Sequence, residues 1–413
     1  MAVEIREVGV AELGEFRRAE AVGFHHEPSA TEADIEHLAA LLTRPGELLG
    51  AFDGGRCVAT YHSFPHEVTA PGGAFVPSNA VSRVTVTPTH RRRGLLTRMI
   101  TEDLRVARER GEILASLIAA EYPIYGRFGF GPAAWLADYR VDLPRAGATS
   151  RWSVPEEGTL AHVDPERVMA EGPALHDRMR ALRHGVVTRP LPWWRRLAGL
   201  YRPSDERWTT PVHLLYTADD GTVEGLATYR SNGKWEGSRP AATLTVQDLI
   251  ATTPAAERAL WRHLCSIDWA VAVETGGRAP DDTLPHWLGD PRAAVVRTYY
   301  DSLWLRPLDV PRLLESRAYP AEADLVLDVH DPQGLTPGRF LLQATPDGAS
   351  CTPTTRTADL TLDVGALATL WIGDDSAHRL SATARLTPHT PDALTRADLL
   401  FPTPRRPWCP DIF

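Results

Sequence analysis

The stretch VTVTPTHRRRGLLTRMI, residues 84–100, places three consecutive arginines directly before a glycine and an apolar stripe with helical spacing. The alternating β-branched residues at its start predict a strand, and the stripe after Gly94 predicts a helix that runs to about Arg110. A helix N-terminus presents unpaired N–H groups and a partial positive charge, so it suits a phosphate. Gly94 permits close approach of the backbone, and the arginines add fork-shaped donors. We therefore expect this corner to bind a diphosphate-bearing ligand; a solvated basic turn is the alternative that charge alone leaves open.

The composition is that of a globular chain with more than one domain. Its 413 residues exceed what one hydrophobic core usually supports, which predicts two or three domains. Hydrophobic residues make up 43% and charged residues 23%, as is usual for globular proteins. The formal net charge of -9 argues against non-specific binding to nucleic acid or anionic lipid. An anionic ligand must therefore be bound by a local cluster of cations.

The sequence carries no clear signal for export, membrane insertion or metal binding. No apolar run approaches the roughly 18–20 residues of a membrane helix. The first ten residues include Glu4 and Glu7, where a signal peptide needs basic residues. The four cysteines are scattered without a C-x-x-C pair, so neither a zinc site nor a disulfide framework is indicated. We expect a cytoplasmic protein that binds no metal.

The expected elements divide the chain into three mixed α/β parts. Residues 1–147 begin with the strand VEIREV, continue with a helix capped by Thr31, and contain a hairpin turn at Asp53-Gly54-Gly55. The buried strand EILASLIA and the glycine-rich and aromatic run YPIYGRFGFGPA follow the basic corner. A linker-like run, DLPRAGATSRWSVPEEGT, places a boundary near Gly147.

The order of elements in residues 148–298 echoes that of the first part. Helices are expected near 165–183 and 191–200, then the strands VHLLYTAD and EGLATYRS, then the helix AAERALWRHLCSID. An internal duplication of the fold would explain this repetition. Residues 299–413 contain DLVLDVHD, GRFLLQATPDG and ADLTLDVGALATLWIG, which predict a sheet with a packed helix.

Other nucleotide-binding and catalytic motifs do not match. The chain has no G-x-x-x-x-G-K-[ST], G-x-S-x-G or H-E-x-x-H sequence. Residues 129–134 fit G-x-G-x-x-A formally, but the run follows a turn and no clear helix opens after it. We therefore reject a dinucleotide-binding site there.

Several segments, in the right order, carry a resemblance to a known family. VTVTPTHRRRGLLTRM resembles the acetyl-CoA signature Q/R-x-x-G-x-G/A of the GNAT superfamily of N-acetyltransferases, and IYGRFGFGPA resembles the enhanced intracellular survival (Eis) family within it. HGVVTRPLPWWRRL, YDSLWLRPLDVPRLLESRAY and ADLLFPTPRRPWCPDIF resemble the family's central and C-terminal segments. The resemblance covers nearly the whole chain.

The resemblance implies an α/β architecture of two tandem GNAT-like domains followed by a sterol-carrier-like domain, assembled as a homohexamer. The expected limits are 1–147 for a catalytic domain, 148–298 for a second domain without cofactor, and 299–413 for the third. It further implies that acetyl-CoA is held by residues of the bulging strand, the basic corner and the next strand end. These are Val84, Thr85, Val86, Arg92, Arg93, Gly94, Leu95, Leu96, Thr97, Ala120 and Glu121.

The resemblance also implies a pair of catalytic groups. Tyr125 matches the family's general acid, because a phenol with pKa about 10 is protonated at neutral pH and can donate to a thiolate. The carboxylate of Phe413 would enter the active site as general base, with burial or a bridging water compensating for its low pKa. A frayed tail is the alternative for Phe413.

The acceptor is less defined. His25, His26 and Glu27 precede a predicted helix where GNAT acceptor sites lie, and Asp411 lies near the chain end, so these four residues are candidates for contact with an amine. Arg83 departs from the family pattern, because an apolar residue is expected before the bulging strand. We expect acetyl transfer to primary amines, aminoglycoside-like or lysine side chains. The alternative is a non-catalytic acyl-CoA or lipid-binding protein.

Overall fold

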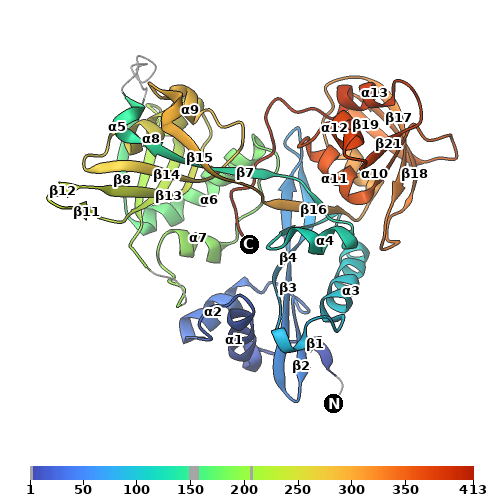
Figure 1. The fold of residues 1–413 in the computed structure, drawn as a ribbon, viewed down its shortest axis with the longest axis horizontal. Coiled ribbons are helices and arrows are strands. Elements are labelled where there is room, and N and C mark those ends of the chain that lie inside the picture. Colours follow the sequence, from blue (N-terminus) through green and yellow to red (C-terminus); the bar gives the residue numbers. More distant parts are fainter. Residues whose placement is uncertain (1–2, 148–157, 205–207) are drawn as a thin grey trace.

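The computed structural model describes residues 3–147, 158–204 and 208–413. They form three α/β domains, with the first at the bottom of Figure 1, the second at the upper left and the third at the upper right. The last residues of the chain lie at the centre, where the three domains meet.

The first domain is built on a seven-stranded mixed sheet of order β1-β2-β3-β4-β5-β16-β6. Strands β4 and β5 are parallel, and helix α3 connects them. The strands are β1 (Glu4–Glu7), β2 (Leu48–Asp53), β3 (Arg56–Thr69), β4 (Phe75–Val86), β5 (Leu114–Ile118), β6 (Gly131–Pro132) and β16 (Leu303–Pro307). The helices are α1 (Leu13–Gly23), α2 (Glu32–Leu41), α3 (Leu95–Glu109) and α4 (Tyr122–Tyr125).

The second domain repeats this topology in a sheet of order β15-β7-β14-β13-β10-β9-β8. Its parallel pair is β13 and β14, connected by α8. The strands are β7 (Trp135–Asp142), β8 (Thr159–Val163), β9 (Val212–Thr217), β10 (Val223–Ser231), β13 (Ala242–Ala251), β14 (Ala270–Arg278) and β15 (Ala294–Asp301). The hairpin β11 (Trp235–Glu236) and β12 (Arg239–Pro240) stands apart from that sheet. The helices are α5 (Leu143–Ala146), α6 (Pro165–Ala181), α7 (Leu191–Leu197), α8 (Pro254–Ser266) and α9 (Leu284–Trp287).

The two sheets match position by position, which confirms the duplication expected from the sequence. They also exchange a strand. The sixth strand of the first sheet, counted from β1, is β16, which follows the second domain in the chain. The sixth strand of the second sheet, counted from β8, is β7, which precedes that domain. Each sheet therefore hydrogen-bonds a strand from the other part of the chain. The first two domains cannot be pulled apart along the chain without breaking one of these β ladders.

The exchange bears on the expected limits of the domains. Strand β7 precedes residue 147 yet pairs in the second sheet, and β16 follows residue 298 yet pairs in the first. The limits 1–147, 148–298 and 299–413 therefore describe chain segments, and as domain boundaries they stay a prediction. The linker expected around residue 147 lies partly outside the described residues, and its beginning forms α5.

The third domain has a five-stranded sheet of order β19-β18-β17-β20-β21. Its strands are β17 (Ala323–His330), β18 (Gly338–Thr345), β19 (Gly348–Pro353), β20 (Leu360–Asp363) and β21 (Leu386–Pro388). Its helices are α10 (Val310–Glu315), α11 (Val364–Ile372), α12 (Ala377–Ala382) and α13 (Ala393–Leu400).

Helix α11 joins the third domain to the first. Every residue of α11 is buried, and its apolar residues share one core with Leu303 and Leu305 of β16. A Cβ added at Gly131 of β6 would lie 2.0 Å from the Gly365 carbonyl oxygen, so the two backbones touch at a distance that only glycine allows. Of the helices in the described part of the chain, none has the length and hydrophobicity that a bilayer crossing requires.

Local sequence signals explain where the main helices begin. Thr31 caps α2 through the N–H of Asp34 (3.2 Å), and the Asp34 carboxylate accepts from the Thr31 N–H (3.0 Å), as in a capping box. Asp164 of α6, Thr253 of α8 and Asp363 of α11 are simpler caps, in which the side chain accepts a hydrogen bond from a backbone N–H in the first turn.

Candidate active site

The first sheet opens at a bulge in β4. Strand β4 pairs with β5 only from Ser78 to Val81, and in its ladder with β3 two residues, Arg83 and Val84, lie opposite Tyr61. Arg83 has φ +51°, in the left-handed region that side chains other than glycine seldom adopt. A bulge bends its strand and increases the local twist, so β4 diverges from β5 beyond Val81.

The basic corner has the geometry expected from the sequence. Gly94 is the N-cap of α3 at φ +74°, and the first helical hydrogen bond of α3 runs from the Arg98 N–H to the Gly94 carbonyl (3.0 Å). A Cβ at position 94 would meet nothing within 4 Å, so this face of the corner is open. Arg92 and Arg93 are exposed, whereas Arg91 donates to the Val86 carbonyl (3.3 Å) at the end of β4.

A cavity of about 450 Å³ lies beside the bulge. It is within the usual size range for small-molecule sites. Its walls come from α1, α2, β3, β4 and the end of β5 in the first domain, from α7 and the residues before it in the second, and from the chain end. Its lining includes Glu20, Asp34, His62, His66, Arg83, Val84, Ala120, Tyr125, Arg189, Asp411 and Phe413.

Tyr125 reaches this cavity from α4. The residue is 7% exposed, and its ring meets the edge of Phe130 at 6.1 Å between centroids. Burial, with a smaller contribution from the charge of Glu121, raises the pKa of Tyr125 to about 12. The phenol therefore holds its proton throughout the physiological range.

Phe413 reaches the cavity from the end of the chain. Its ring packs edge-on against His66 (5.0 Å between centroids) and Phe64 (6.1 Å) of β3. Asp411 is 3% exposed, and Arg189 donates from Nε to one of its oxygens (2.8 Å). Burial raises the pKa of Asp411 to about 6, against the opposing charge of Arg189. Asp411 and the ring of Phe413 are thus packed, whereas Ile412 between them is exposed, so the chain end is not frayed in the structure.

The other carboxylates of the cavity are engaged by neighbours. Glu20 lies between Arg83 (2.5 Å) and Arg17 (3.3 Å), which gives Arg83 at the bulge an ionic partner in α1. Asp34 accepts hydrogen bonds from the hydroxyls of Tyr201 (2.8 Å) and Ser204 (2.6 Å) as well as from its own cap. Burial raises the pKa of Asp34, but these hydrogen bonds outweigh it and hold the pKa below its usual range.

Two buried histidines of β3 line the cavity, and neither is among the site residues predicted from the sequence. His62 and His66 flank Phe64 at a spacing of two, so all three share one face of the strand. Burial lowers the pKa of each histidine to about 3, so both imidazoles are neutral. Among the described residues the ring nitrogens of His62 have no hydrogen-bond partner, whereas Nε2 of His66 pairs with Ser116 (2.5 Å). The alternation in YHSFPHEV was the signal that could have found them.

The structure brings most predicted site residues to one region. Tyr125, Phe413, Val84, Ala120, His26 and Asp411 all line the cavity, and the corner residues 92–97 lie at the N-terminus of α3, which follows the bulged strand. Of the described residues, His25 and Glu27 are exposed and outside the cavity lining. Glu121 is exposed directly before α4.

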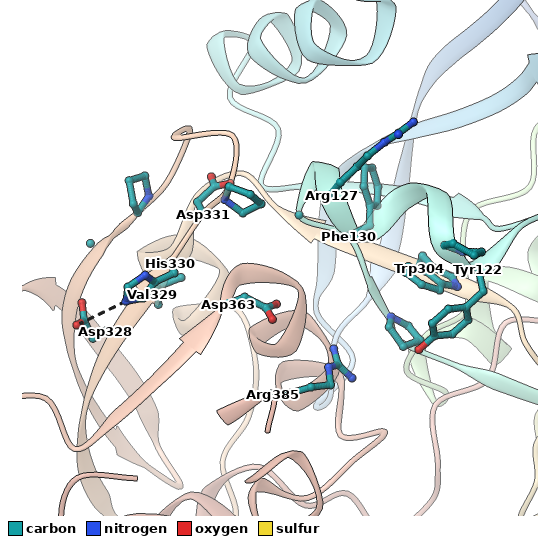
Figure 2. Close-up of a pocket in the computed structure, with 17 residues that line it drawn as sticks. Tyr122, Arg127, Phe130, Trp304, Asp328, Val329, His330, Asp331, Asp363 and Arg385 are labelled. Carbon is teal, nitrogen blue, oxygen red and sulfur yellow. Dashed lines mark ion pairs between the residues drawn. The ribbon is translucent and has the colours of Figure 1, made fainter. Parts of the chain in front are cut away.

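A larger cavity of about 950 Å³ lies between the first and third domains. Figure 2 shows Tyr122 and Trp304 on one side of it and Asp363 and Arg385 on the other. Tyr122 packs edge-on against Trp304 at 4.9 Å between centroids. The two cavities share the α4 turn, but Tyr125 and the bulge of β4 belong to the smaller one, so the smaller one is the candidate active site. In the part of the chain that the structure describes, no group of three metal-ligating side chains is found.

Comparison with known proteins agrees with this architecture. Residues 4–133 and 185–306 each match an acetyltransferase (GNAT) domain family, and residues 310–410 match a sterol carrier protein domain family. An N-acetyltransferase of Streptomyces avermitilis is 52% identical over 413 residues, covering 100% of this chain and 99% of the relative. The N-acetyltransferase Eis of Mycobacterium tuberculosis is 33% identical over 359 residues, 85% of each chain. The crystal structure of Eis1 from Mycobacterium abscessus matches with a TM-score of 0.84 and 33% identity over 100% of both chains.

Two GNAT domains with one open basic corner, followed by a sterol-carrier-like domain, make this chain an N-acetyltransferase of the GNAT type. Within that class, the family is shown by the similarity of the chain, along most of its length, to the mycobacterial Eis proteins. The chain belongs to the Eis family.

Proposed function

We propose that the protein transfers the acetyl group of acetyl-CoA to a primary amine, with Tyr125 as general acid and the Phe413 carboxylate as general base. The observation that carries this proposal is that Tyr125 and Phe413, 288 positions apart in the sequence, line one cavity beside the divergence of β4 and β5. A lipid carrier or an acyl-CoA sensor requires neither group in that place.

The residues of the cofactor region suit acetyl-CoA. The N-terminal amides of α3, with Gly94 in the left-handed conformation and Arg92 and Arg93 exposed beside it, form a cradle for a diphosphate. The main chain of Val84–Val86 is available to the pantetheine arm where β4 leaves β5, with Ala120 and Glu121 on the far side. Acetyl-CoA supplies the thioester whose acetyl group is transferred.

Tyr125 serves as acid because burial keeps it protonated. A phenol with a pKa of about 12 donates less readily than one at 10 to a thiolate whose ordinary pKa is about 8.5. Full proton transfer to such a thiolate would be uphill by about 5 kcal/mol. The same apolar cavity that raises the pKa of Tyr125 also raises that of a thiolate inside it, so the difference is reduced at the site itself.

The base and the neutral imidazoles act on the acceptor. The carboxylate of the half-buried Phe413 can take the proton of the incoming ammonium, directly or through water. His62 and His66 are uncharged, so they do not repel that ammonium. Neither ring nitrogen of His62 has a hydrogen-bond partner among the described residues, so the unprotonated nitrogen can accept a hydrogen bond from the ammonium or from water.

The cavity walls favour an acceptor with one amino group on an apolar body. Glu20 and Asp411 are each paired with arginine and Asp34 is held by hydroxyls, so few free carboxylates remain to bind a polycation. Phe24, Phe64, Leu38, Trp193 and Tyr201 supply the apolar surface. This weighs against the multiply charged aminoglycosides expected from the sequence.

Thiol release tests the proposal. Purified protein is incubated with acetyl-CoA, a thiol reagent and a panel of aromatic monoamines, polyamines and aminoglycosides. Amine-dependent thiol release, with the acetylated amine identified by mass, is expected. If acetyl-CoA binds but no amine accelerates thiol release, the protein is a sensor or carrier and the proposal is wrong.

A further inference from the structure

The second domain has a crevice that corresponds to the acetyl-CoA crevice of the first, and the chain end fills it. Strand β13 carries an extra residue between Val246 and Asp248 in its ladder with β10, and it pairs with β14 only from Ala242 to Thr245. Beyond that point the strands diverge, as β4 and β5 do. The indole Nε1 of Trp408 donates to the Gly277 carbonyl (3.0 Å) of β14.

The side of this crevice next to α8 is closed as well. Arg278 of β14 donates to the Leu249 carbonyl (3.1 Å) of β13, ion-pairs with Glu257 of α8 (2.7 Å), and lies 4.8 Å from the centre of the Trp408 ring. Only about 150 Å³ remains open there. The helix start is Thr253-Pro254, without the Arg-Gly corner of the first domain. This crevice therefore has room for the tail and none for a coenzyme.

Three residues after Trp408, the tail is held again by the second domain. Arg189, with a side chain that is 1% exposed, contacts both oxygens of Asp248 (2.9 Å each) and donates from Nε to Asp411 (2.8 Å). Its guanidinium also stacks on Trp193, 3.8 Å from the ring centre. Asp248 adjoins the extra residue of β13, so the irregular part of that strand provides the support for Arg189.

The contacts of Asp411 limit where the carboxylate of Phe413 can lie in space. Two extended residues span at most about 7 Å, so fixing Asp411 confines the Phe413 carboxylate to a small region. Ile412 is 75% exposed and holds little. The position of the carboxylate therefore depends on Asp411 on one side and on the contacts of the Phe413 ring with Phe64 and His66 on the other.

We propose that Arg189 and Asp411 form a pair that positions the general base. In this arrangement the second GNAT-like domain anchors that base, because its crevice holds the C-terminal tail in place of a coenzyme. The proposal rests on the proposed function, in which the Phe413 carboxylate is the base. It gives Asp411 a role other than the acceptor contact expected from the sequence.

Asp411→Ala tests the pair without leaving a buried charge unpaired, because Arg189 keeps Asp248. We expect kcat to fall 10- to 100-fold, the loss typical of a reacting group displaced by about 1 Å, with acetyl-CoA affinity unchanged. Asp411→Asn keeps an oxygen for Arg189 Nε and is expected to retain most of the rate. The matched control is Asp359→Ala, which removes an aspartate–arginine pair (Asp359–Arg396, 2.6 Å) of the third domain and should leave kcat unaltered.

Deleting Phe413 provides the second arm. If Asp411 acts only by placing the carboxylate, Asp411→Ala should cost less than about twofold in a chain that already lacks Phe413. Equal losses in both backgrounds, or no loss in the full chain, would overturn the proposal.

A third measurement does not depend on turnover. A carboxypeptidase should release Phe413 at least tenfold faster from Asp411→Ala than from the parent or from Asp359→Ala. Equal release rates would refute the anchor even if the protein proved inactive. A protein that shows slow release in the parent but no thiol release with any amine would instead refute the proposed function and leave the anchor standing.

Discussion

Replacing Tyr125 with phenylalanine removes the proposed acid and little else. Tyr125 lines the cavity, and among the described residues its hydroxyl has no hydrogen-bond partner that would be left unsatisfied. The free energy of unfolding should therefore change by less than about 0.5 kcal/mol. A positioned general acid contributes about 10²- to 10⁴-fold to a rate, so kcat should fall by that factor, which is about 3 to 5 kcal/mol of barrier.

The pH dependence of kcat provides a sharper test of the same residue. Burial raises the pKa of Tyr125 to about 12, so the phenol keeps its proton as the pH rises and loses it only near that value. The parent should show no fall in kcat between pH 8 and pH 10, whereas a phenol at its ordinary pKa of about 10 would be half deprotonated at the upper limit.

The assay is thiol release at saturating acetyl-CoA and amine, with coenzyme affinity measured separately by calorimetry. The matched control is Tyr229→Phe, at a buried tyrosine of β10 in the second domain, 6% exposed, whose pKa burial also raises. The control should keep the parent rate. A Tyr125→Phe enzyme with more than a third of the parent kcat, or a parent whose kcat falls with a midpoint below pH 10, would refute the reasoning.

Three other changes probe the site. Arg92→Ala should raise the KM for acetyl-CoA about 5- to 30-fold, the equivalent of 1 to 2 kcal/mol for an exposed charge-assisted contact, with kcat within about twofold; a loss confined to kcat would contradict a ground-state contact. Gly94→Ala should strain the turn at φ +74°, lower the midpoint of thermal unfolding and weaken acetyl-CoA binding. The control Gly221→Ala, at φ +86° in the second domain, should lower only the midpoint. Equal coenzyme affinities in the two variants would argue against the diphosphate cradle at Gly94. One glycine added after Phe413 should lower kcat at least tenfold with unchanged coenzyme affinity, and unaltered turnover would remove that carboxylate from the mechanism.

The local signals of the sequence were strong because they are carried by neighbouring residues. The strand–turn–helix corner around Gly94, the N-cap at Thr31 and the repeated order of strands and helices all depend on contacts within a few positions, so periodicity and cap chemistry predicted them. The histidines at 62 and 66 were visible as an alternating pattern, but burial, which makes them neutral and places them at the cavity, depends on the packed fold.

Other features could not be read from the sequence, because they join residues hundreds of positions apart. The exchange of β7 and β16 is set by which sheet each strand completes. The pairing of Arg83 with Glu20 depends on how α1 lies across the bulge, and this pair is why an arginine occupies a place where an apolar residue was expected.

By itself, then, the sequence determined the three α/β parts, the basic strand–turn–helix corner at Gly94 and the family to which the chain belongs, since each depends on short runs of residues. Tertiary structure alone decided that Tyr125 and Phe413 share a cavity, that the carboxylates around them are already paired, and that the second domain holds the tail through Arg189. The physical reason is that burial and charge pairing depend on distances in space, and the chain reaches those distances only once all three domains have packed around its last residues.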